Sequence, residues 1–302
     1  MIVTRVKRLL AKFVGCLAFM QLSSAGEADW EDLLDEGLTK WEVFTGVPHK
    51  SVEVPGRERT ESVDGIQGGE PIGLSDPLGI FTTELVDGEV VLKVTGEVFG
   101  ALTSLEDYES YHLSFQFRWG EKKWEPRLDK KRDSGLLFHC VGEHGVGWNA
   151  WMQSLECQIQ EGDCGDFIPV ANARAFVPFR SGEDLELGEY ELGVFDPKQS
   201  LREVKGAVVV HSPSEERPNG EWNTIEIYAV DSRAVFVVNG TPNMAIFDAQ
   251  QFSDGEFEPL TKGKLQIQAE AAELEYRRIK IRSIGDFPVQ LGKFVGRPEA
   301  GE

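Results

Sequence analysis

Long apolar segments are missing from this 302-residue sequence after its first 25 residues. No later stretch approaches the roughly 20 apolar residues that a helix needs to cross a bilayer, so we expect no membrane span there. Positive charge is also scarce, with 31 Lys and Arg against 51 Asp and Glu and a net charge of −20. Such a surface repels nucleic acid and anionic lipid, which disfavours both partners and suits a neutral substrate.

Cysteine is scarce as well, with 4 in the chain. Cys16 lies in a segment that we expect to be removed on export, so Cys140, Cys157 and Cys164 remain in the mature protein. This odd number allows at most one disulfide within the chain. No spacing among them matches a zinc site. Strand parity predicts that Cys140 and Cys157 point into the core, as packed thiols or as that disulfide. We expect Cys164 to be the exposed and most reactive thiol.

The first 25 residues have the layout of a secretory signal. Basic residues open the segment, residues 13–22 are mainly apolar, and residues 23–25 are small, as at a signal peptidase site. An uncleaved anchor and a lipoprotein signal are the alternatives, but the apolar runs are short for both. We therefore expect an exported protein, periplasmic or secreted, whose mature chain begins near Gly26.

Glycine is abundant, with 32 residues, and turn-forming pairs separate short alternating segments. The clearest alternation is at 111–119, where aromatic and aliphatic residues take every second position. Asp87-Gly88 and Asn239-Gly240 are typical of hairpin turns. This pattern predicts an all-β, antiparallel β-sandwich of the jelly-roll kind. We expect a single domain over 26–302, with a core at about 41–284, loop insertions at 50–79 and 167–203, and a short helix at 30–39.

Four stretches resemble, in order, motifs of the 3-keto-disaccharide hydrolase family. They are DSGLLFH at 133–139, SLECQIQEGDCGDF at 154–167, EWNTIEIYAVDSRAVFVVNG at 221–240 and GKLQIQAEAAELEYRRIKIR at 263–282. The resemblance covers about 41–284. It implies a concanavalin A-like lectin/glucanase fold and cleavage of a 3-keto-glycoside or 3-keto-disaccharide. Asp133 stands where the family usually has Asn, and His139 where it often has Arg, so the fold transfers more safely than the substrate.

The strand expected at 154–160 carries a polar row. Glu156, Gln158 and Gln160 share one face, because side chains alternate along a strand, while the residues between them face the core. On the concave sheet of a jelly roll this row would point at a sugar. Related glucanases have Glu-x-Asp-x-x-Glu, but here an amide takes the middle position and Glu161 has the opposite parity. The carboxyl pair of a retaining glycosidase, about 5–5.5 Å apart, is therefore not evident.

Keto-sugar cleavage makes smaller demands than ordinary glycoside hydrolysis. A C3 ketone acidifies the hydrogen on C2, so a base, a proton donor and a group that polarises the ketone suffice for elimination followed by hydration. Glu156 is the first choice for the base. Glu270, which shares a face with Gln268 on a later strand, is the second acid/base candidate. His139 is a candidate proton donor or metal ligand, with a purely structural role as the alternative.

Further residues are candidates for binding the sugar. Arg118 either binds sugar hydroxyls or the developing enolate or forms a surface salt bridge, and Asp133 either caps its loop or binds a hydroxyl. Indole rings stack on the C–H surfaces of sugars. The full set of predicted substrate-binding residues is Arg118, Asp133, Gln158, Gln160, Gln268, Trp124, Trp148 and Trp151.

An acidic, glycine-spaced turn at 161–166 is a candidate calcium site. Glu161, Asp163 and Asp166 supply the oxygen ligands that calcium prefers, although the turn lacks the length of an EF-hand loop. The alternative is an acidic turn without metal. Two other functions stay open for the whole chain: a non-catalytic, lectin-like carbohydrate-binding module and an ordinary retaining glycoside hydrolase. The same fold serves all three.

Overall fold

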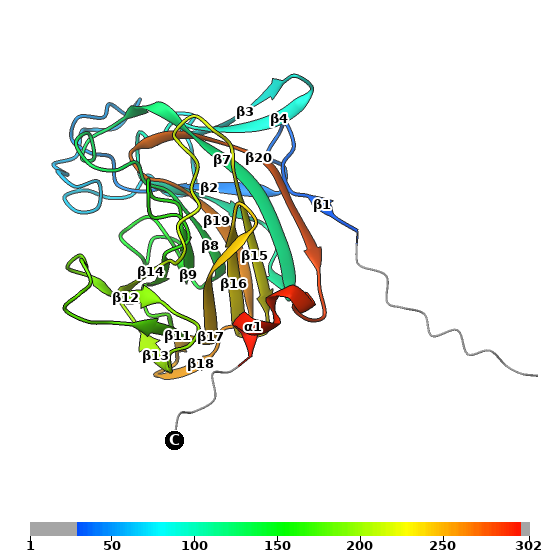
Figure 1. Ribbon diagram of the computed structural model, residues 1–302. Helices are drawn as coiled ribbons and strands as arrows, with labels where there is room; N and C mark the ends of the chain where they lie inside the picture. Colours follow the sequence, from blue (N-terminus) through cyan, green and yellow to red (C-terminus); the bar gives the residue numbers. More distant parts are fainter. Residues whose placement is uncertain (1–28, 297–302) are drawn as a thin grey trace, which may run out of the picture.

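The computed structural model describes residues 29–296, and the predicted signal segment lies outside them. The described chain is almost entirely β, and its strands form two packed layers, which confirms the predicted antiparallel β-sandwich (Figure 1). Among the described strands only β12 and β14 pair in parallel. No helix in residues 29–296 is long and apolar enough to cross a bilayer.

One layer, the β7 sheet, is a run of antiparallel strands in which β1 (Glu31–Asp32) also pairs with β20. Its order is β3 (Phe81–Val86), β4 (Glu89–Val94), β20 (Ala272–Ser283), β7 (Tyr111–Lys123), β15 (Asn223–Val230), β16 (Arg233–Val238) and β17 (Thr241–Ser253). The predicted Asp87-Gly88 and Asn239-Gly240 turns join β3 to β4 and β16 to β17, and all four residues have positive φ, as this hairpin turn requires.

The second layer, the β9 sheet, packs against the first. Its order is β2 (Trp41–Thr45), β5 (Gly100–Ser104), β19 (Lys262–Ala269), β8 (Gly135–Val141), β9 (Gln153–Gln158), β10 (Phe167–Val170), β14 (Val208–Val210) and β12 (Glu191–Phe195). The remaining elements are β6 (Tyr108–Glu109), β11 (Arg174–Arg180), β13 (Leu201–Val204), β18 (Glu256–Pro259), the 3₁₀ turn η1 (Val289–Leu291) and α1 (Gly292–Val295).

Two local expectations differ from the structure. Residues 167–203 were expected as an irregular insertion, but they contain four strands, β10 to β13, and β10 and β12 widen the β9 sheet. Residues 30–39 contain β1 and turns instead of a helix. The Asp35 carboxylate accepts hydrogen bonds from the backbone N–H groups of Gly37 and Thr39, and this local capping favours a turn over a helix.

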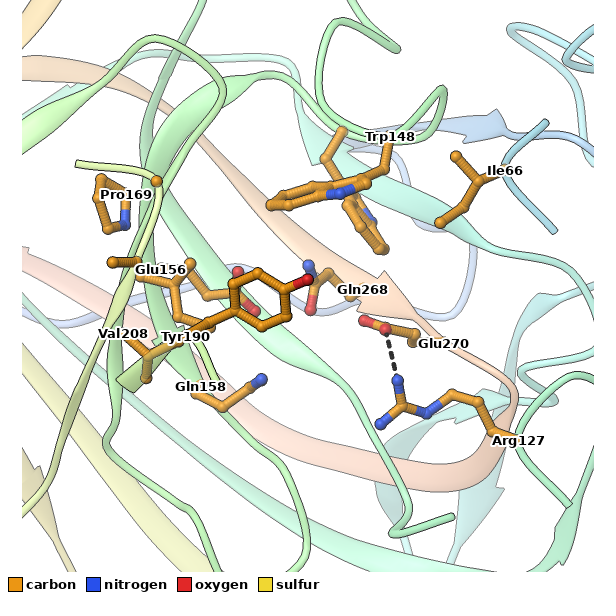
Figure 2. Close-up of a pocket in the computed structure, with 14 residues that line it drawn as sticks. Ile66, Arg127, Trp148, Glu156, Gln158, Pro169, Tyr190, Val208, Gln268 and Glu270 are labelled. Atoms are coloured by element: carbon orange, nitrogen blue, oxygen red, sulfur yellow. Dashed lines mark hydrogen bonds and ion pairs between the residues drawn. The ribbon is translucent and has the colours of Figure 1, made fainter. Parts of the chain in front are cut away.

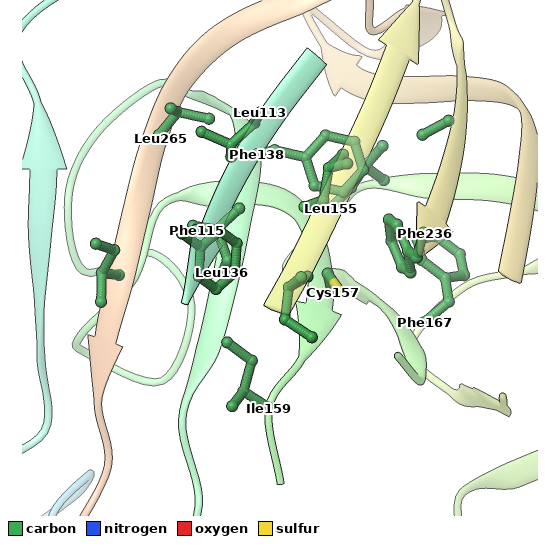
Figure 3. Close-up of a cluster of buried hydrophobic side chains, with 14 of the residues drawn as sticks. Leu113, Phe115, Leu136, Phe138, Leu155, Cys157, Ile159, Phe167, Phe236 and Leu265 are labelled. Atoms are coloured by element: carbon green, nitrogen blue, oxygen red, sulfur yellow. The ribbon is translucent and has the colours of Figure 1, made fainter. Parts of the chain in front are cut away.

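The main core lies between the two sheets. Phe115 and Phe117 from β7 are buried there with Phe138 from β8 and Leu155 and Cys157 from β9 (Figure 3). The strict alternation at 111–119 thus predicted the buried face of β7 correctly. Cys157 points into this core, as predicted, and it is a packed free thiol and not part of a disulfide.

A smaller apolar cluster lies on the other face of the β9 sheet. It contains Leu137 and Cys140 from β8 together with Trp151 and Phe99, and Ile66 from the loop between β2 and β3 packs against it. Loops therefore cover part of this face. The part that they leave open forms a pocket.

Cys140 belongs to this smaller cluster, so its predicted direction was wrong. The pairing of β8 with β9 shifts register between Phe138 and Val141, and His139 has a φ of 51°. This bulge reverses the parity after Phe138. It turns His139 toward the Tyr111 ring, 5.7 Å away, and Cys140 toward the opposite face.

Cys164 was expected to be exposed, but it is 1 % exposed. The turn between β9 and β10 folds inward, because Gly165 N–H donates to Gln158 O at 2.9 Å. Asn243 Nδ2 also donates to the Cys164 carbonyl at 3.0 Å. These hydrogen bonds hold the turn against the core, so the predicted exposure of Cys164 was wrong.

Candidate functional site

A pocket of about 560 Å³ opens on the loop-bearing face of the β9 sheet (Figure 2). Its floor is polar. Glu156 and Gln158 come from β9, and Gln268 comes from β19. Glu270 directly follows β19, and Arg127 comes from the loop between β7 and β8. A pocket with a few converging polar groups is typical of a small-molecule site. The face predicted for Glu156 and Gln158 is confirmed.

Glu156 occupies space that only a glycine beside it provides. Gly135 on β8 pairs with Gln158 on β9, and Gln158 is two residues along the strand from Glu156 on the same face. A Cβ atom at Gly135 would overlap both Glu156 Oε1 and Gln268 Oε1. The carboxyl of Glu156 and the amide of Gln268 therefore lie together over the bare backbone of β8.

The carboxyl group of Glu156 favours its protonated form. The residue is 3 % exposed, and no ion pair to it is found within residues 29–296. Burial raises its pKa well above the usual 4.5, the negative charge of Asp133 raises it further, and a hydrogen bond with Gln268 opposes the shift. Glu156 is therefore suited to donate a proton.

Glu270 lies in a different electrostatic environment, because a cation faces it. Arg127 Nη1 is 3.2 Å from Glu270 Oε1, and Arg127 Nη2 also forms an ion pair with Asp133 Oδ2. The backbones of Asp133 and Glu270 form an isolated antiparallel bridge, which brings both carboxyls to the same guanidinium. One positive charge thus pairs with two carboxyl groups, of which Asp133 is buried and Glu270 has a side chain that is 13 % exposed.

The Asp133 and Glu270 carboxyls lie close enough to influence each other's protonation. Asp133 Oδ1 is buried without a hydrogen-bond partner in the described chain. Burial raises the pKa of Asp133 well above its usual range, and the neighbouring Glu270 charge adds to this shift. Burial also raises the pKa of Glu270, to about 7, although Arg127 lowers it. Glu270 therefore changes protonation near neutral pH.

Asp133 and Gln160 support the pocket from outside its wall. Gln160 Nε2 donates to Asp133 Oδ2 at 2.7 Å, and neither side chain lines the cavity. Gln158 does line it: its Oε1 accepts from the Ile159 backbone N–H at 3.0 Å, which leaves its amide NH₂ for a ligand. Of the predicted amides, Gln158 and Gln268 are thus placed at the pocket and Gln160 is placed behind it.

Two of the three predicted tryptophan platforms line the pocket. Trp148 is 47 % exposed, and Trp151 lies beneath it, with ring centroids 5.7 Å apart in an edge-on arrangement. Trp124 is not among the lining residues. Its indole N–H donates to Thr95 O at 2.8 Å, and Lys122 Nζ lies over its ring. Trp124 therefore packs beside the site instead of lining it.

His139 does not lie in the pocket. The bulge in β8 places it 1 % exposed between Tyr111 and Phe138. Burial lowers its pKa to about 3, so the ring is neutral at physiological pH. The structure therefore favours the structural role that was the alternative for this residue.

Arg118 lies on the other layer of the sandwich, on β7. Its Nε donates to Glu275 Oε2 at 2.5 Å, and its guanidinium lies 4.6 Å from the centre of the Trp222 ring. It is not among the residues that line the pocket. The surface salt bridge, the alternative for Arg118, is the arrangement found.

The three acidic residues proposed for calcium have separate partners. Glu161 pairs with Arg132, and Asp163 pairs with Lys131. Asp166 Oδ1 accepts the backbone N–H of His211 at 2.7 Å. Within residues 29–296 no group of three or more His, Cys, Asp or Glu is arranged to hold a metal ion.

Two residues at the pocket, Arg127 and Tyr190, were missed by the sequence analysis. Arg127 lies among several cations, Lys122, Lys123 and residues 130–132, so its pattern is that of a solvent-facing loop. Tyr190 lies in the segment expected as an insertion, where no spacing relates it to Glu156. Only the paired strands bring both residues to the cavity.

Comparison with solved structures finds several β-sandwich proteins at low sequence identity. A candidate glycosyl hydrolase from Parabacteroides distasonis is 16% identical, with a TM-score of 0.46, and the match covers 85% of this chain and all of that one (100%). The carbohydrate-binding module CBM66 from Bacillus subtilis is 9% identical, with a TM-score of 0.38 and coverage of 67% and 92%. No curated protein matches the sequence.

The family comparison covers most of the chain. Residues 29–282 match the family model described as the 3-keto-alpha-glucoside-1,2-lyase-like domain. This range contains both sheets and every residue of the polar pocket floor, and it agrees with the resemblance found from the four sequence motifs. The chain therefore belongs to the family of 3-keto-α-glucoside-1,2-lyase-like domains, which ties it to carbohydrates.

Proposed function

We propose that this protein is an enzyme that cleaves the glycosidic bond of 3-keto-glycosides or 3-keto-disaccharides by elimination followed by hydration. The observation that carries the proposal is a pocket lined by two carboxyl groups in contrasting environments. Glu270 faces the Arg127 cation, whereas Glu156 lies beside the amide of Gln268. Carboxyls whose environments differ in this way divide naturally into a base and an acid. The family match supports this class of substrate.

The reaction requires two proton transfers. Glu270, as a carboxylate, removes the hydrogen on C2, and the electrons of that C–H bond form an enolate with the C3 ketone. The amide NH₂ of Gln158 donates a hydrogen bond to the enolate oxygen. The C1–O bond then breaks, the aglycone oxygen takes the proton of Glu156, and a C1=C2 double bond remains. Addition of water across that bond yields the free 3-keto-sugar.

This assignment reverses the order in which the sequence ranked the two glutamates. Parity alone favoured Glu156 as the base, but a base must be ionised at the working pH. A buried carboxyl without a cation is costly to ionise, whereas Arg127 offsets that cost for Glu270. The raised pKa of Glu156 and the pKa of about 7 for Glu270 support the same division.

The electrostatics argue against a purely lectin-like module. Binding a neutral sugar needs hydrogen-bond donors and acceptors, which amides supply at little cost. Asp133 and Glu156 are buried and Glu270 is largely so, yet the one cation beside them, Arg127, pairs only with Asp133 and Glu270, and burying such groups destabilises a fold. Groups with strongly perturbed pKa values that line a cavity are typical of catalysis.

An ordinary glycoside hydrolase is the second candidate, because Glu156 and Glu270 supply the carboxyl pair that one strand alone lacked. The substrate separates the two mechanisms. We expect a 3-keto-glucoside to be cleaved and its unoxidised parent to be left intact, because only the ketone acidifies C2. Cleavage of both at similar rates would favour the ordinary hydrolase, and glycan binding without any cleavage would favour the lectin.

Exchange of the C2 hydrogen with deuterium from solvent tests the separate roles. Glu156→Gln keeps the base, so we expect C2 exchange to continue while release of an alcohol aglycone slows at least ~10²-fold, the usual scale for general acid loss. Glu270→Gln should abolish both exchange and cleavage. Loss of exchange in Glu156→Gln, with retention in Glu270→Gln, would return the base to Glu156.

A further inference from the structure

The mouth of the pocket differs chemically from its floor. Above the polar floor the walls are formed by large, mainly apolar side chains. Figure 2 shows Pro169 and Val208 on one side of the cavity and Trp148 and Ile66 on the other. Ile168, which pairs with Glu156 across β10 and β9, and Tyr190 complete the walls. A ligand that reaches Glu156 passes between these surfaces.

Few polar side-chain atoms are available at this mouth. Among its six wall residues only Trp148 and Tyr190 carry a hydrogen-bonding group, one each. A second sugar ring would bring several hydroxyl groups there, and these two side chains could pair with only some of the hydroxyls that lose water. The cation at the pocket, Arg127, is already engaged by Asp133 and Glu270, so an anionic group would find no free counter-charge there.

The two aromatic residues at the rim are unusually exposed. Tyr190 is 66 % exposed and Trp148 is 47 % exposed. Trp148 also has a φ of 49°, a left-handed backbone conformation that bulky residues rarely adopt. Exposed aromatic rings beside an apolar wall gain free energy when a flat apolar ligand covers them.

We propose that the aglycone of the natural substrate is an uncharged apolar group, such as an aromatic ring, and not a second sugar. The keto-sugar lies on the polar floor, and the aglycone lies between Trp148, Tyr190 and the wall of Ile168, Pro169 and Val208. This inference rests on the proposed function, because it identifies the leaving group of that reaction.

Two 3-keto-glucosides with matched leaving groups test it. One carries 2-phenylethanol and the other carries glucose linked through a primary hydroxyl, so both release an aliphatic alcohol. We expect kcat/KM to be at least ~10-fold higher for the phenylethyl substrate, as is usual when a hydrophobic pocket discriminates. Trp148→Ala and Tyr190→Ala should reduce this ratio, while Phe252→Ala, at an exposed phenylalanine that does not line the cavity, should leave it unchanged.

Equal or faster cleavage of the disaccharide, or a ratio that Trp148→Ala leaves intact, would overturn the inference. If neither substrate is cleaved, the proposed function fails, and calorimetric binding decides the aglycone separately. We then expect 2-phenylethyl glucoside to bind more tightly than the unoxidised disaccharide, and Trp148→Ala to remove the difference. Equal binding of the two ligands would sink the inference.

Discussion

Glu156 depends on a neighbour that has no side chain. Gly135 leaves the space above β8 in which the Glu156 carboxyl and the Gln268 amide lie. We predict that Gly135→Ala displaces the carboxyl and lowers kcat by ~10²-fold, because misplacement of a catalytic group by about 1 Å has that effect.

Circular dichroism of Gly135→Ala should show an intact fold, since the overlapping atoms are side-chain ends. Gly285→Ala is the matched control, because an added Cβ there meets nothing within 4 Å and the position lies outside the pocket. Normal turnover in Gly135→Ala would mean that Glu156 acts from another position.

The buried carboxyl of Glu156 should make the protein less stable as pH rises. Because its pKa is raised on folding, the folded protein binds more protons than the unfolded chain between pH 4.5 and the folded pKa. The contribution of Glu156 to the free energy of unfolding is therefore fully present below pH 4.5. Above that pH the free energy of unfolding falls, by up to about 1.4 kcal/mol per pH unit for one such group. Glu156→Gln lacks this dependence.

We predict that the melting temperature of Glu156→Gln exceeds that of the wild type by an amount that grows from pH 5 to pH 8. Differential scanning calorimetry over this range measures the difference. A gap that stays constant, or shrinks as pH rises, would show that Glu156 is not held in its protonated form.

The pH dependence of catalysis should report Glu270. Its pKa is raised to about 7 by burial, with Arg127 opposing the shift. As the base it must be ionised, so kcat/KM should rise with pH up to about 7 and then level off. It should fall only at the higher pH at which Glu156 loses its proton. Glu270→Asp should shift the rising limb, and an unshifted limb would assign it to another group.

At the scale of single strands, the alternation of residues was a reliable guide wherever the backbone stays regular. It predicted the buried face of β7 and the pocket face of β9, because a two-residue period forces successive side chains to opposite faces. It failed in β8, where the bulge at His139 reversed the direction of Cys140. No glycine marks that bulge in the sequence, and a residue other than glycine is uncommon at positive φ.

The buried thiols give a test at this scale. All three cysteines of the described chain are free and buried, and burial raises their pKa values above the usual range. We predict that a thiol reagent labels Cys140, Cys157 and Cys164 slowly in the native protein and rapidly in denaturant, because the reactive thiolate is rare and inaccessible. Mass spectrometry after brief labelling measures this. Rapid native labelling of Cys164 would restore its predicted exposure.

For the whole molecule, the sequence could predict the layers but not which residues meet across them. Arg118 looked suited to a sugar site because it alternates with core residues, yet its strand belongs to the β7 sheet and the pocket lies on the β9 sheet. Arg127 and Tyr190 reach the pocket from segments about 30 residues on either side of Glu156. Such proximity follows from strand order, which local periodicity does not contain.

The floor and the mouth of the pocket differ in how much of each comes from loops. Paired strands supply Glu156, Gln158 and Gln268 in the floor, whereas loops supply three residues of the mouth, Ile66, Trp148 and Tyr190. Strand residues are constrained by register on both sides, so changing them disturbs their neighbours. Loops tolerate insertion and deletion. Over evolutionary time, descendants of one ancestral sandwich can therefore diversify the compounds they accept by exchanging these rim segments, while the reaction step itself is inherited unaltered.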